Sequence, residues 1–546
     1  MTQIKIWTSI CAIVVASPAL GQSAIDRVDP SRIERDNLPK PPKVKEPQPV
    51  VERAVPATVI PETIAVEVGA ITFEGLRDLS ERDFSDIFAR YIGRSLSADE
   101  LTRLTEEIGS RARGRGYVFA SAAIAPQRLS AGVLRVQYDP GILEAVRIDG
   151  DENAAVRAAL APLIGRPARM DEVERRLLIA GDVSGVTILR SAFVREDGRG
   201  TLVVKTSETR TRVRAVFEND STAPIGPEQF RIDADINGVL ASDDAFTVTY
   251  VSTPFEPAEL QYVRAGYSKR VSRDGTEVAL AVAASSTHPG AYLDAFDISG
   301  DSLSATVSVL QPLHRRRTAS LWLNGSVSLR DVEQFRAGER RRRDRILAVR
   351  VSVNWNMQAG GGLLRGSLTL SQGLDALGAT AAGDALASRD DADGTFTTLL
   401  GWGDWTRGLG GGVSLRLAAQ AQLSSRPLLV AEEIGIGGSA FLRGYDYSER
   451  SGDQGYMGLA EVRYDWRNPL GLGRKAQLYA FVDGGRVTNL AGGFGGGGLV
   501  SGGGGVRADV SPSIDANVEL AVPLSGPRYE TENKDPRLNL RVLKAF

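Results

Sequence analysis

The sequence predicts an all-β, 16-stranded antiparallel transmembrane barrel, preceded by two small α+β units of βααββ order. First, apolar and polar residues alternate in the second half over segments of about nine to eleven residues, the length of a tilted strand that crosses a bilayer. Second, the mean hydropathy is only -0.13, as expected where apolar and polar faces average out. Third, one short pattern occurs twice before the strands begin.

Composition excludes several functional classes. The chain of 546 residues carries 65 Lys+Arg against 67 Asp+Glu, a balance that does not suit a general nucleic-acid binder. It has 1 Cys and 2 His, which leaves little material for a zinc site, a histidine-based triad or a disulfide framework. We therefore expect no catalytic residues, no metal and no cofactor.

The N-terminus has the layout of a secretory signal peptide over residues 1–21. Met1–Lys5 is weakly basic, Ile6–Ala16 is an apolar run, and the small residues Ala19 and Gly21 precede the expected cleavage. A buried N-terminal helix is the alternative. Residues 22–66 are rich in proline and predict an extended linker, with a short helix over Ser31–Asn37.

The repeated pattern predicts two units of about 70 residues, at residues 67–140 and 141–208. Each begins with an apolar, polar, apolar, acid, glycine sequence and continues with two helices and two strands. In the first unit, Ser97 and Glu100 form a capping box. The helices are expected over Leu79–Tyr91, from Ser97, over Asn153–Leu163 and over Met170–Ile179, and the strands over Ile71–Gly75, Val118–Ile124, Val133–Tyr138, Val146–Gly150, Gly185–Ser191 and Thr201–Thr206.

The barrel is predicted over residues 209–546. In Val413–Leu423 one face is apolar, while the other carries Arg and Gln, which a soluble β-sandwich would not favour. Short turns alternate with long loops such as Arg330–Asp344 and Ser424–Tyr456. The sixteen strands are expected to begin near Thr211, Gln229, Ala245, Gln261, Thr276, Asp301, Thr318, Arg345, Gly362, Thr395, Gly412, Met457, Ala476, Val500, Ile514 and Leu538.

Three motifs carry a resemblance to a known family. The longest loop contains Gly437–Tyr445 and Gly452–Gly455, a later strand contains Phe481–Gly485, and the first unit ends in Gly116-Tyr-Val-Phe followed by Ile124-Ala-Pro-Gln. Together they resemble the two-partner secretion transporters of the haemolysin secretion/activation family, outer-membrane barrels with periplasmic POTRA domains. The resemblance covers about residues 67–546. It implies a monomeric pore in the bilayer that captures a large unfolded exoprotein in the periplasm and moves it to the cell surface, without binding nucleic acid.

The same motifs predict a functional site. Alternation places Phe481 and Asp483 on the lumen side of one strand and Glu461 and Asp465 on the lumen side of the preceding one. A long loop folding inward could bring Arg443 to these acids, where a guanidinium binds carboxylate well. Gly444 would allow close backbone approach and Tyr445 would pack on the wall. The resemblance implies Arg443–Asp483 as the main pair, and a solvated loop arginine is the alternative.

Two further predictions concern the periplasmic side. Strand edges near Thr187–Ser191 and Thr201–Thr206 could take up an extended client by strand addition, whereas the alternative makes the two units simple rigid spacers. The basic turn His314–Arg317 is expected on the periplasmic rim, where it could steer an acidic client, although a solvated turn is the favoured interpretation.

Three other functions stay open. A barrel-assembly insertase of the same superfamily generally carries more POTRA domains than two. A passive porin would not need the repeated units. An outer-membrane hydrolase would need a triad in the lumen, and neither His288 in an outer loop nor His314 in the rim turn fits one.

Overall fold

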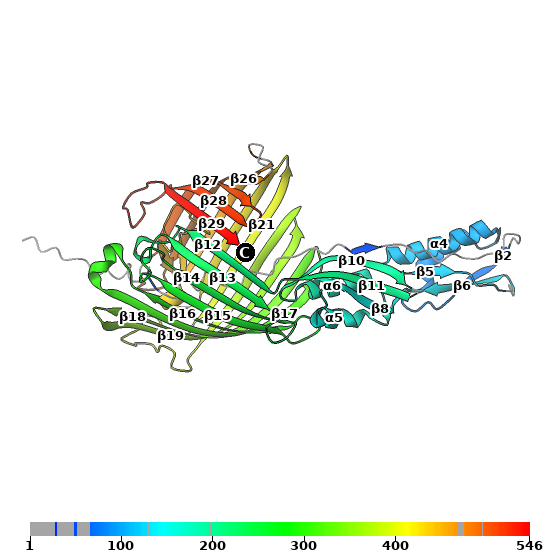
Figure 1. Ribbon diagram of the computed structural model, residues 1–546, viewed down its shortest axis with the longest axis horizontal. Coiled ribbons are helices and arrows are strands. Elements are labelled where there is room, and N and C mark those ends of the chain that lie inside the picture. The colour runs from blue at the N-terminus through cyan, green and yellow to red at the C-terminus, as the bar shows by residue number, and fades with distance from the viewer. Residues whose placement is uncertain are drawn as a thin grey trace, which may run out of the picture.

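The computed structural model describes residues 28–29, 49–51, 66–127, 131–196, 199–467, 469, 474–493 and 495–546. The predicted signal peptide and the helix over Ser31–Asn37 lie outside these residues. A β-barrel fills one end of the molecule, and two small α+β units extend from it in a line (Figure 1). In the described part of the chain, no helix is both long and apolar enough to cross a membrane.

The first unit has the predicted order of elements. It contains β3 (Ala70–Glu74), η1 (Glu81–Phe84), α3 (Ser85–Phe88), α4 (Ala98–Gly114), β5 (Ser121–Ala123) and β6 (Val133–Asp139), with β2 (Val66–Val68) and β4 (Arg94–Leu96) forming a small two-stranded antiparallel sheet. The main sheet runs β3-β6-β5. The Ser97–Glu100 capping box at α4 is confirmed. The helix expected over Leu79–Tyr91 is wrong in extent, because only η1 and the one-turn α3 form there.

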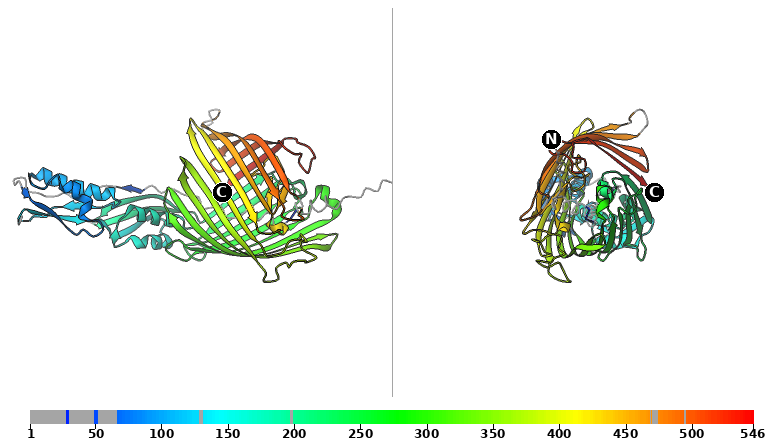
Figure 2. Two further views of the ribbon diagram at one scale, coloured as in Figure 1. Left: turned by 180° about the vertical axis from the view of Figure 1, so that it is seen from behind. Right: turned by 90° about the vertical axis from the view of Figure 1, so that its left-hand side faces the viewer.

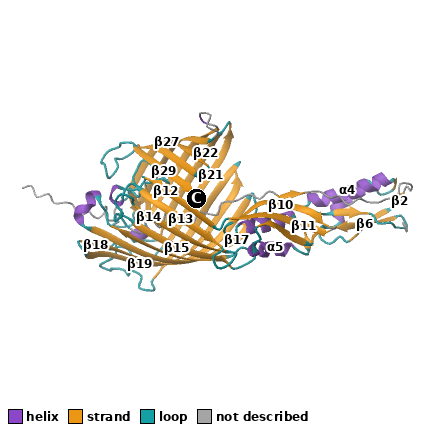
Figure 3. Ribbon diagram, in the orientation of Figure 1, coloured by secondary structure: helices purple, strands orange, loops and turns teal. Residues whose placement is uncertain are grey.

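The second unit repeats this order with β8 (Ala145–Gly150), α5 (Ala154–Leu160), η2 (Ala161–Leu163), α6 (Met170–Gly181), β10 (Val186–Glu196) and β11 (Arg199–Glu208). The Asn153 side chain caps α5 by accepting from the backbone of Ala155 and Val156. The short strands β7 (Ile142–Leu143) and β9 (Arg166–Pro167) form a separate two-stranded antiparallel sheet in this unit. Figure 3 shows the long helices gathered in these two units.

The prediction of strand edges in the second unit is wrong for one segment and incomplete for the other. Thr201–Thr206 lies in β11, which is hydrogen-bonded to β10 on one side and β8 on the other. Thr187–Ser191 lies in β10, whose outer side pairs in parallel with β1 (Pro49–Val51) of the proline-rich segment. Sequence patterns did not indicate β1, because three residues are too few for a period to show.

The sixteen-stranded closed antiparallel barrel is confirmed. Each strand pairs with the next, and β12 pairs with β29 to close the ring. The strands are β12 (Thr211–Glu218), β13 (Gln229–Asn237), β14 (Asp244–Ser252), β15 (Gln261–Arg270), β16 (Glu277–Thr287), β17 (Ile298–Arg315), β18 (Ala319–Arg336), β19 (Glu339–Ala359), β20 (Gly362–Leu374), β21 (Thr397–Gly410), β22 (Val413–Ser424), β25 (Gln454–Arg467), β26 (Lys475–Thr488), β27 (Gly497–Ser511), β28 (Ile514–Pro523) and β29 (Arg537–Ala545).

One predicted loop is a strand pair instead. The segment Arg330–Asp344 continues β18 and β19 into a hairpin that turns at Ala337 and Gly338. Its many charged residues suggested a solvated loop, but cross-strand ion pairs such as Arg343–Asp331, at 2.8 Å, let the ladder extend.

The barrel wall has an apolar outer face and a polar inner face. Val307, Val351 and Leu520 are exposed on the outside, each by more than 40%, as expected for side chains that face lipid. We call the end of the barrel beside the second unit the near mouth and the opposite end, which carries the long loops, the far mouth. Seen end-on, the strands enclose a lumen (Figure 2, right).

Candidate functional site

The longest loop, residues 425–453, folds from the far mouth onto the inner wall. It contains η5 (Val430–Glu432), β23 (Ile434–Ile436) and β24 (Arg450–Gly452). Its tip, residues 441–445, is buried in an apolar cluster that includes Leu442 and Tyr445 from the loop and Leu459, Phe481 and Leu499 from the wall. The loop tip is therefore packed against the barrel as a core element would be.

Arg443 at this tip meets carboxylates from three different wall strands. Its Nη1 donates to Glu519 at 2.8 Å and to Glu461 at 3.0 Å, and its Nε contacts Asp483 at 3.3 Å. The backbone N–H of Arg443 also donates to Asp483, at 3.3 Å. The expected approach of Arg443 to the acidic wall is present, but Asp483 is one partner of three and lies farther from the guanidinium than Glu519 and Glu461 do.

The acids of this cluster are held by further contacts. Glu461 also binds Arg463 and Arg507, at 2.6 and 3.0 Å. Ser501 donates its hydroxyl to Asp483. The guanidinium carbon of Arg443 lies 3.3 Å from the ring centroid of Phe481, a cation–π contact. Arg443 is 4% exposed, and Asp483 and Glu519 are 2% and 4% exposed. Removal of Arg443 would take the cation from these two buried carboxylates, a change that typically costs about 3–5 kcal/mol.

The residues that follow Arg443 fit the wall closely. A Cβ atom at Gly444 would lie 2.8 Å from the carbonyl carbon of Val522 and 2.9 Å from the nitrogen of Pro523, so only glycine fits there. The Gly444 N–H donates to Ser501 Oγ at 3.1 Å. Tyr445 is fully buried, and its hydroxyl donates to the Gly526 carbonyl at 3.0 Å. The loop tip therefore complements the barrel wall in shape as well as in charge.

Of the predicted wall partners, Asp483, Phe481 and Glu461 lie at the loop tip, and Asp465 does not. Asp465 is exposed near the near mouth and accepts from Gln477 at 2.8 Å. It shares the lumen face with Glu461 but lies four residues along β25, about 13 Å away. Sequence reasoning missed Glu519 on β28, although the exposed neighbours Val518 and Leu520 show the same alternation.

A second buried arginine ties the far-mouth loops to one another. Arg389, in the loop between β20 and β21, contacts Asp453 at 2.7 Å, Glu433 at 2.9 Å and Asp391 at 3.0 Å. Asp453 also accepts from the backbone of Leu428 and Leu490. Burial alone would lower the pKa of Arg389, but its three acidic partners outweigh burial and raise it. Arg389 therefore joins two loops, and its partner Asp453 joins the second of them to a third.

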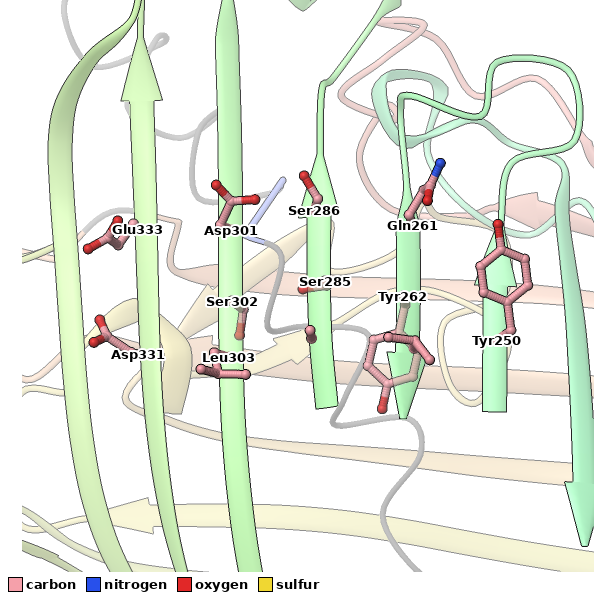
Figure 4. A pocket seen from close by; sticks show the side chains of 12 residues that line it. Tyr250, Gln261, Tyr262, Ser285, Ser286, Asp301, Ser302, Leu303, Asp331 and Glu333 are labelled. Atoms are coloured by element: carbon pink, nitrogen blue, oxygen red, sulfur yellow. The ribbon is translucent and has the colours of Figure 1, made fainter. Parts of the chain in front are cut away.

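A groove in the described part of the chain lies away from this site. It has a volume of about 500 Å³ and crosses β14 to β18 near the far mouth. Its residues include Val263 and Leu303, which are exposed with the lipid-facing side chains, and the acids Asp301, Asp331 and Glu333 (Figure 4). The groove lies mainly on the outer surface, and Arg443 and its partners do not line it.

Comparisons with known proteins identify the family. Residues 200–508 match the model for "Haemolysin secretion/activation protein ShlB/FhaC/HecB", and residues 66–141 match the ShlB-type POTRA domain. This chain belongs to the haemolysin secretion/activation family. It is therefore an outer-membrane β-barrel transporter, with its POTRA region in the periplasm. The near mouth is then periplasmic and the far mouth faces the cell surface.

Relatives and solved structures agree with this membership. The outer membrane transporter CdiB of Dickeya dadantii is 23% identical over 75% of this chain and 74% of its own length. The heme/hemopexin transporter protein HuxB of Haemophilus influenzae is 22% identical over 50% of each chain. CdiB from Escherichia coli has a similar structure, with a TM-score of 0.72, 18% identity and coverage of 97% of this chain and 98% of that one. CdiB from Acinetobacter baumannii has a TM-score of 0.62, 15% identity and coverage of 97% and 98%.

Proposed function

We propose that this chain exports one large exoprotein, which it receives unfolded in the periplasm and passes through the barrel to the cell surface. The proposal rests on the position of the loop tip around Arg443. This tip lies on the inner wall of the lumen, next to Glu461 near the middle of β25, and so beside the route that a polypeptide would take. The closed ring of strands has no free edge, which supports a barrel that works as a monomer.

The Arg443 cluster fits a device that shapes the export path. Four charged side chains, all nearly buried, fix the loop tip to strands β25, β26 and β28. A buried ion cluster of this kind gives a specific position more than net stability. We infer that it keeps the loop beside one wall, and that a loop freed from the wall would obstruct the passing chain.

The second unit offers a site for the unfolded client. The outer side of β10 binds backbone by strand pairing, as its contact with β1 at Ser191–Phe193 demonstrates. A three-residue parallel strand is a weak competitor, because each ladder bond adds little net free energy. We infer that an extended client replaces β1 on β10, a mode that reads backbone more than side chains.

Photo-crosslinking tests this client site. A photoreactive residue at Leu189 on β10, which is 55% exposed, should capture the client during export. The matched position is Lys205, an exposed residue on the central strand β11, which is paired on both sides and should capture little. Equal capture at both positions would contradict strand addition at β10.

The export function itself is tested by comparing cells with and without this chain. Loss of one large protein from the medium is expected. Loss of many outer-membrane barrels would point to the insertase alternative, and an unchanged set of secreted proteins would point to a passive pore. The family is one of transporters rather than enzymes, and we infer that the chain performs no chemistry on its client.

A further inference from the structure

The basic turn His314–Arg317 is not simply solvated. Arg316 is exposed, but Arg315 is only 2% exposed, at the end of β17 on the near mouth. Its Nε and Nη2 donate to the two carboxylate oxygens of Asp182, at 2.9 and 2.7 Å, a fork geometry that favours arginine over lysine. Asp182 is the C-cap residue of α6 in the second unit. The turn is therefore joined to the periplasmic region.

Barrel side chains hold Arg315 in this orientation. Its Nη1 donates to Ser320 Oγ at 2.7 Å, and its guanidinium carbon lies 4.7 Å from the ring centroid of Trp322. Both Ser320 and Trp322 lie on β18 and are nearly fully buried. The arginine is thus fixed to the barrel before it reaches Asp182.

A second arginine meets the same end of α6. Arg270, at the end of β15, donates from Nη1 to the carbonyl of Ile179 at 2.6 Å and is 7% exposed. Cations are favourable at a helix C-terminus, where carbonyl groups lack partners within the helix. Burial raises the pKa of Asp182, and the nearby Arg315 and Arg270 oppose that shift. The end of α6 therefore sits between two barrel arginines.

Further contacts come from three successive turns of the near mouth. Arg176 on α6 binds Asp274 at 3.0 Å in the turn between β15 and β16. Glu174 accepts from the backbone N–H of Arg317 in the turn between β17 and β18. Asn153, before α5, donates to the carbonyl of Ser242 at 3.0 Å in the turn between β13 and β14. The second unit is thus held over the side of the mouth formed by β13 to β18.

We propose that Arg315, which binds Asp182 and packs against Trp322, is a positioning residue. It holds the second unit at a fixed position beside the barrel mouth while a client enters. This inference rests on the proposed export function. It assigns the basic turn a role between domains, in place of steering an acidic client. Its physical basis is that a client bound on β10 reaches the lumen only if β10 keeps a fixed position beside the mouth.

The test uses the full-length chain with Cys11, its only cysteine, replaced by alanine. Cysteines at Glu174 and Arg317 report docking through a short, reducible bifunctional reagent. Arg315→Ala should lower both the crosslink yield and the client secretion about tenfold. Arg316→Ala, which removes the exposed neighbour, should change neither. Barrel folding is followed by heat-modifiable migration in gels.

Rescue separates positioning from folding. In the fraction of the Arg315→Ala protein that becomes crosslinked, secretion should return to the parental level. Chemical reduction of the crosslink should abolish secretion again. The proposal is overturned if Arg315→Ala leaves the crosslink yield unchanged, if it undocks the unit without affecting secretion, or if the crosslinked protein does not secrete. Arg443→Ala should keep the crosslink and lose secretion, and a parental chain that secretes nothing would instead contradict the proposed function.

Discussion

Arg443 and Arg389 are two buried arginines in neighbouring loops of the far mouth, and each contacts three carboxylates. The partners of Arg443 all lie on wall strands, in β25, β26 and β28. The partners of Arg389 all lie in loops, at Asp391, Glu433 and Asp453. The first arginine fixes a loop to a rigid wall, and the second fixes loops to one another.

The different partners of Arg443 and Arg389 predict where the protein should move. Wall strands are held by ladders on both sides, so the carboxylates around Arg443 keep their places when the arginine is removed. The loops around Arg389 have fewer backbone bonds to hold them, and low-stability segments open first. Loss of Arg443 should therefore release only the loop tip, whereas loss of Arg389 should let the far mouth open.

The largest effect short of removing Arg443 is expected from Gly444→Ala. The new methyl group would meet the backbone of Val522 and Pro523, which cannot move without disturbing β28. Overpacking of this kind costs about 1–3 kcal/mol, enough to displace the tip, and secretion should fall about thirtyfold. Gly526→Ala is the control, since its Cβ would meet no atom within 4 Å. Equal secretion by the two variants would show that the close fit is unimportant.

Glu519→Gln should have the next largest effect. It removes the negative charge nearest to Arg443 but keeps the shape of the side chain, so secretion should fall about tenfold, in line with about 1.5 kcal/mol for a hydrogen bond to a charged group. Asp465→Asn, on the same lumen face but away from the tip, should secrete normally. If Asp465→Asn were the more damaging change, the assignment of the wall partners would be wrong.

Arg389→Ala should open the far mouth while leaving the loop tip in place. Its three acidic partners would then repel one another without their common cation. Conductance of the purified barrel in planar bilayers should rise several-fold, with secretion reduced by less than in Gly444→Ala. Arg426→Ala, at an exposed loop pair, is the matched control. An unchanged conductance would mean that Arg389 does not close the mouth.

The smallest effect is expected at Glu530 in the loop after β28. Burial, together with the nearby Asp446, raises the pKa of Glu530 to about 7 from its usual 4.5. The folded state then holds this proton more tightly than the unfolded state does, so stability falls as the pH rises from about 4.5 to about 7. Glu530→Gln should make thermal unfolding less dependent on pH in this range. An identical pH profile for both proteins would refute the assignment.

The sequence predicted the barrel well because a period of two over long strands is a strong signal, and it predicted which residues face the lumen. It did not give the height on the wall at which the loop tip lies, which is why Asp465 was grouped with Glu461 as a partner of Arg443. Height depends on strand tilt and register. The contacts of Arg389 and Arg315 could not be predicted either, since they join segments up to 133 residues apart that only the closed fold brings together. The strand β1 forms only because β10 offers an edge.

The most direct measurement is client secretion by Arg443→Ala, with the folded barrel measured in the same cells. The wall carboxylates that meet Arg443 lie on strands held by their own ladders, so the barrel should assemble in the outer membrane as before. We expect a normal amount of heat-modifiable barrel and at least about a hundredfold loss of the exoprotein from the medium, corresponding to roughly 3 kcal/mol at the buried cluster. Normal secretion by this variant would contradict the claim that the fixed loop tip is needed for export.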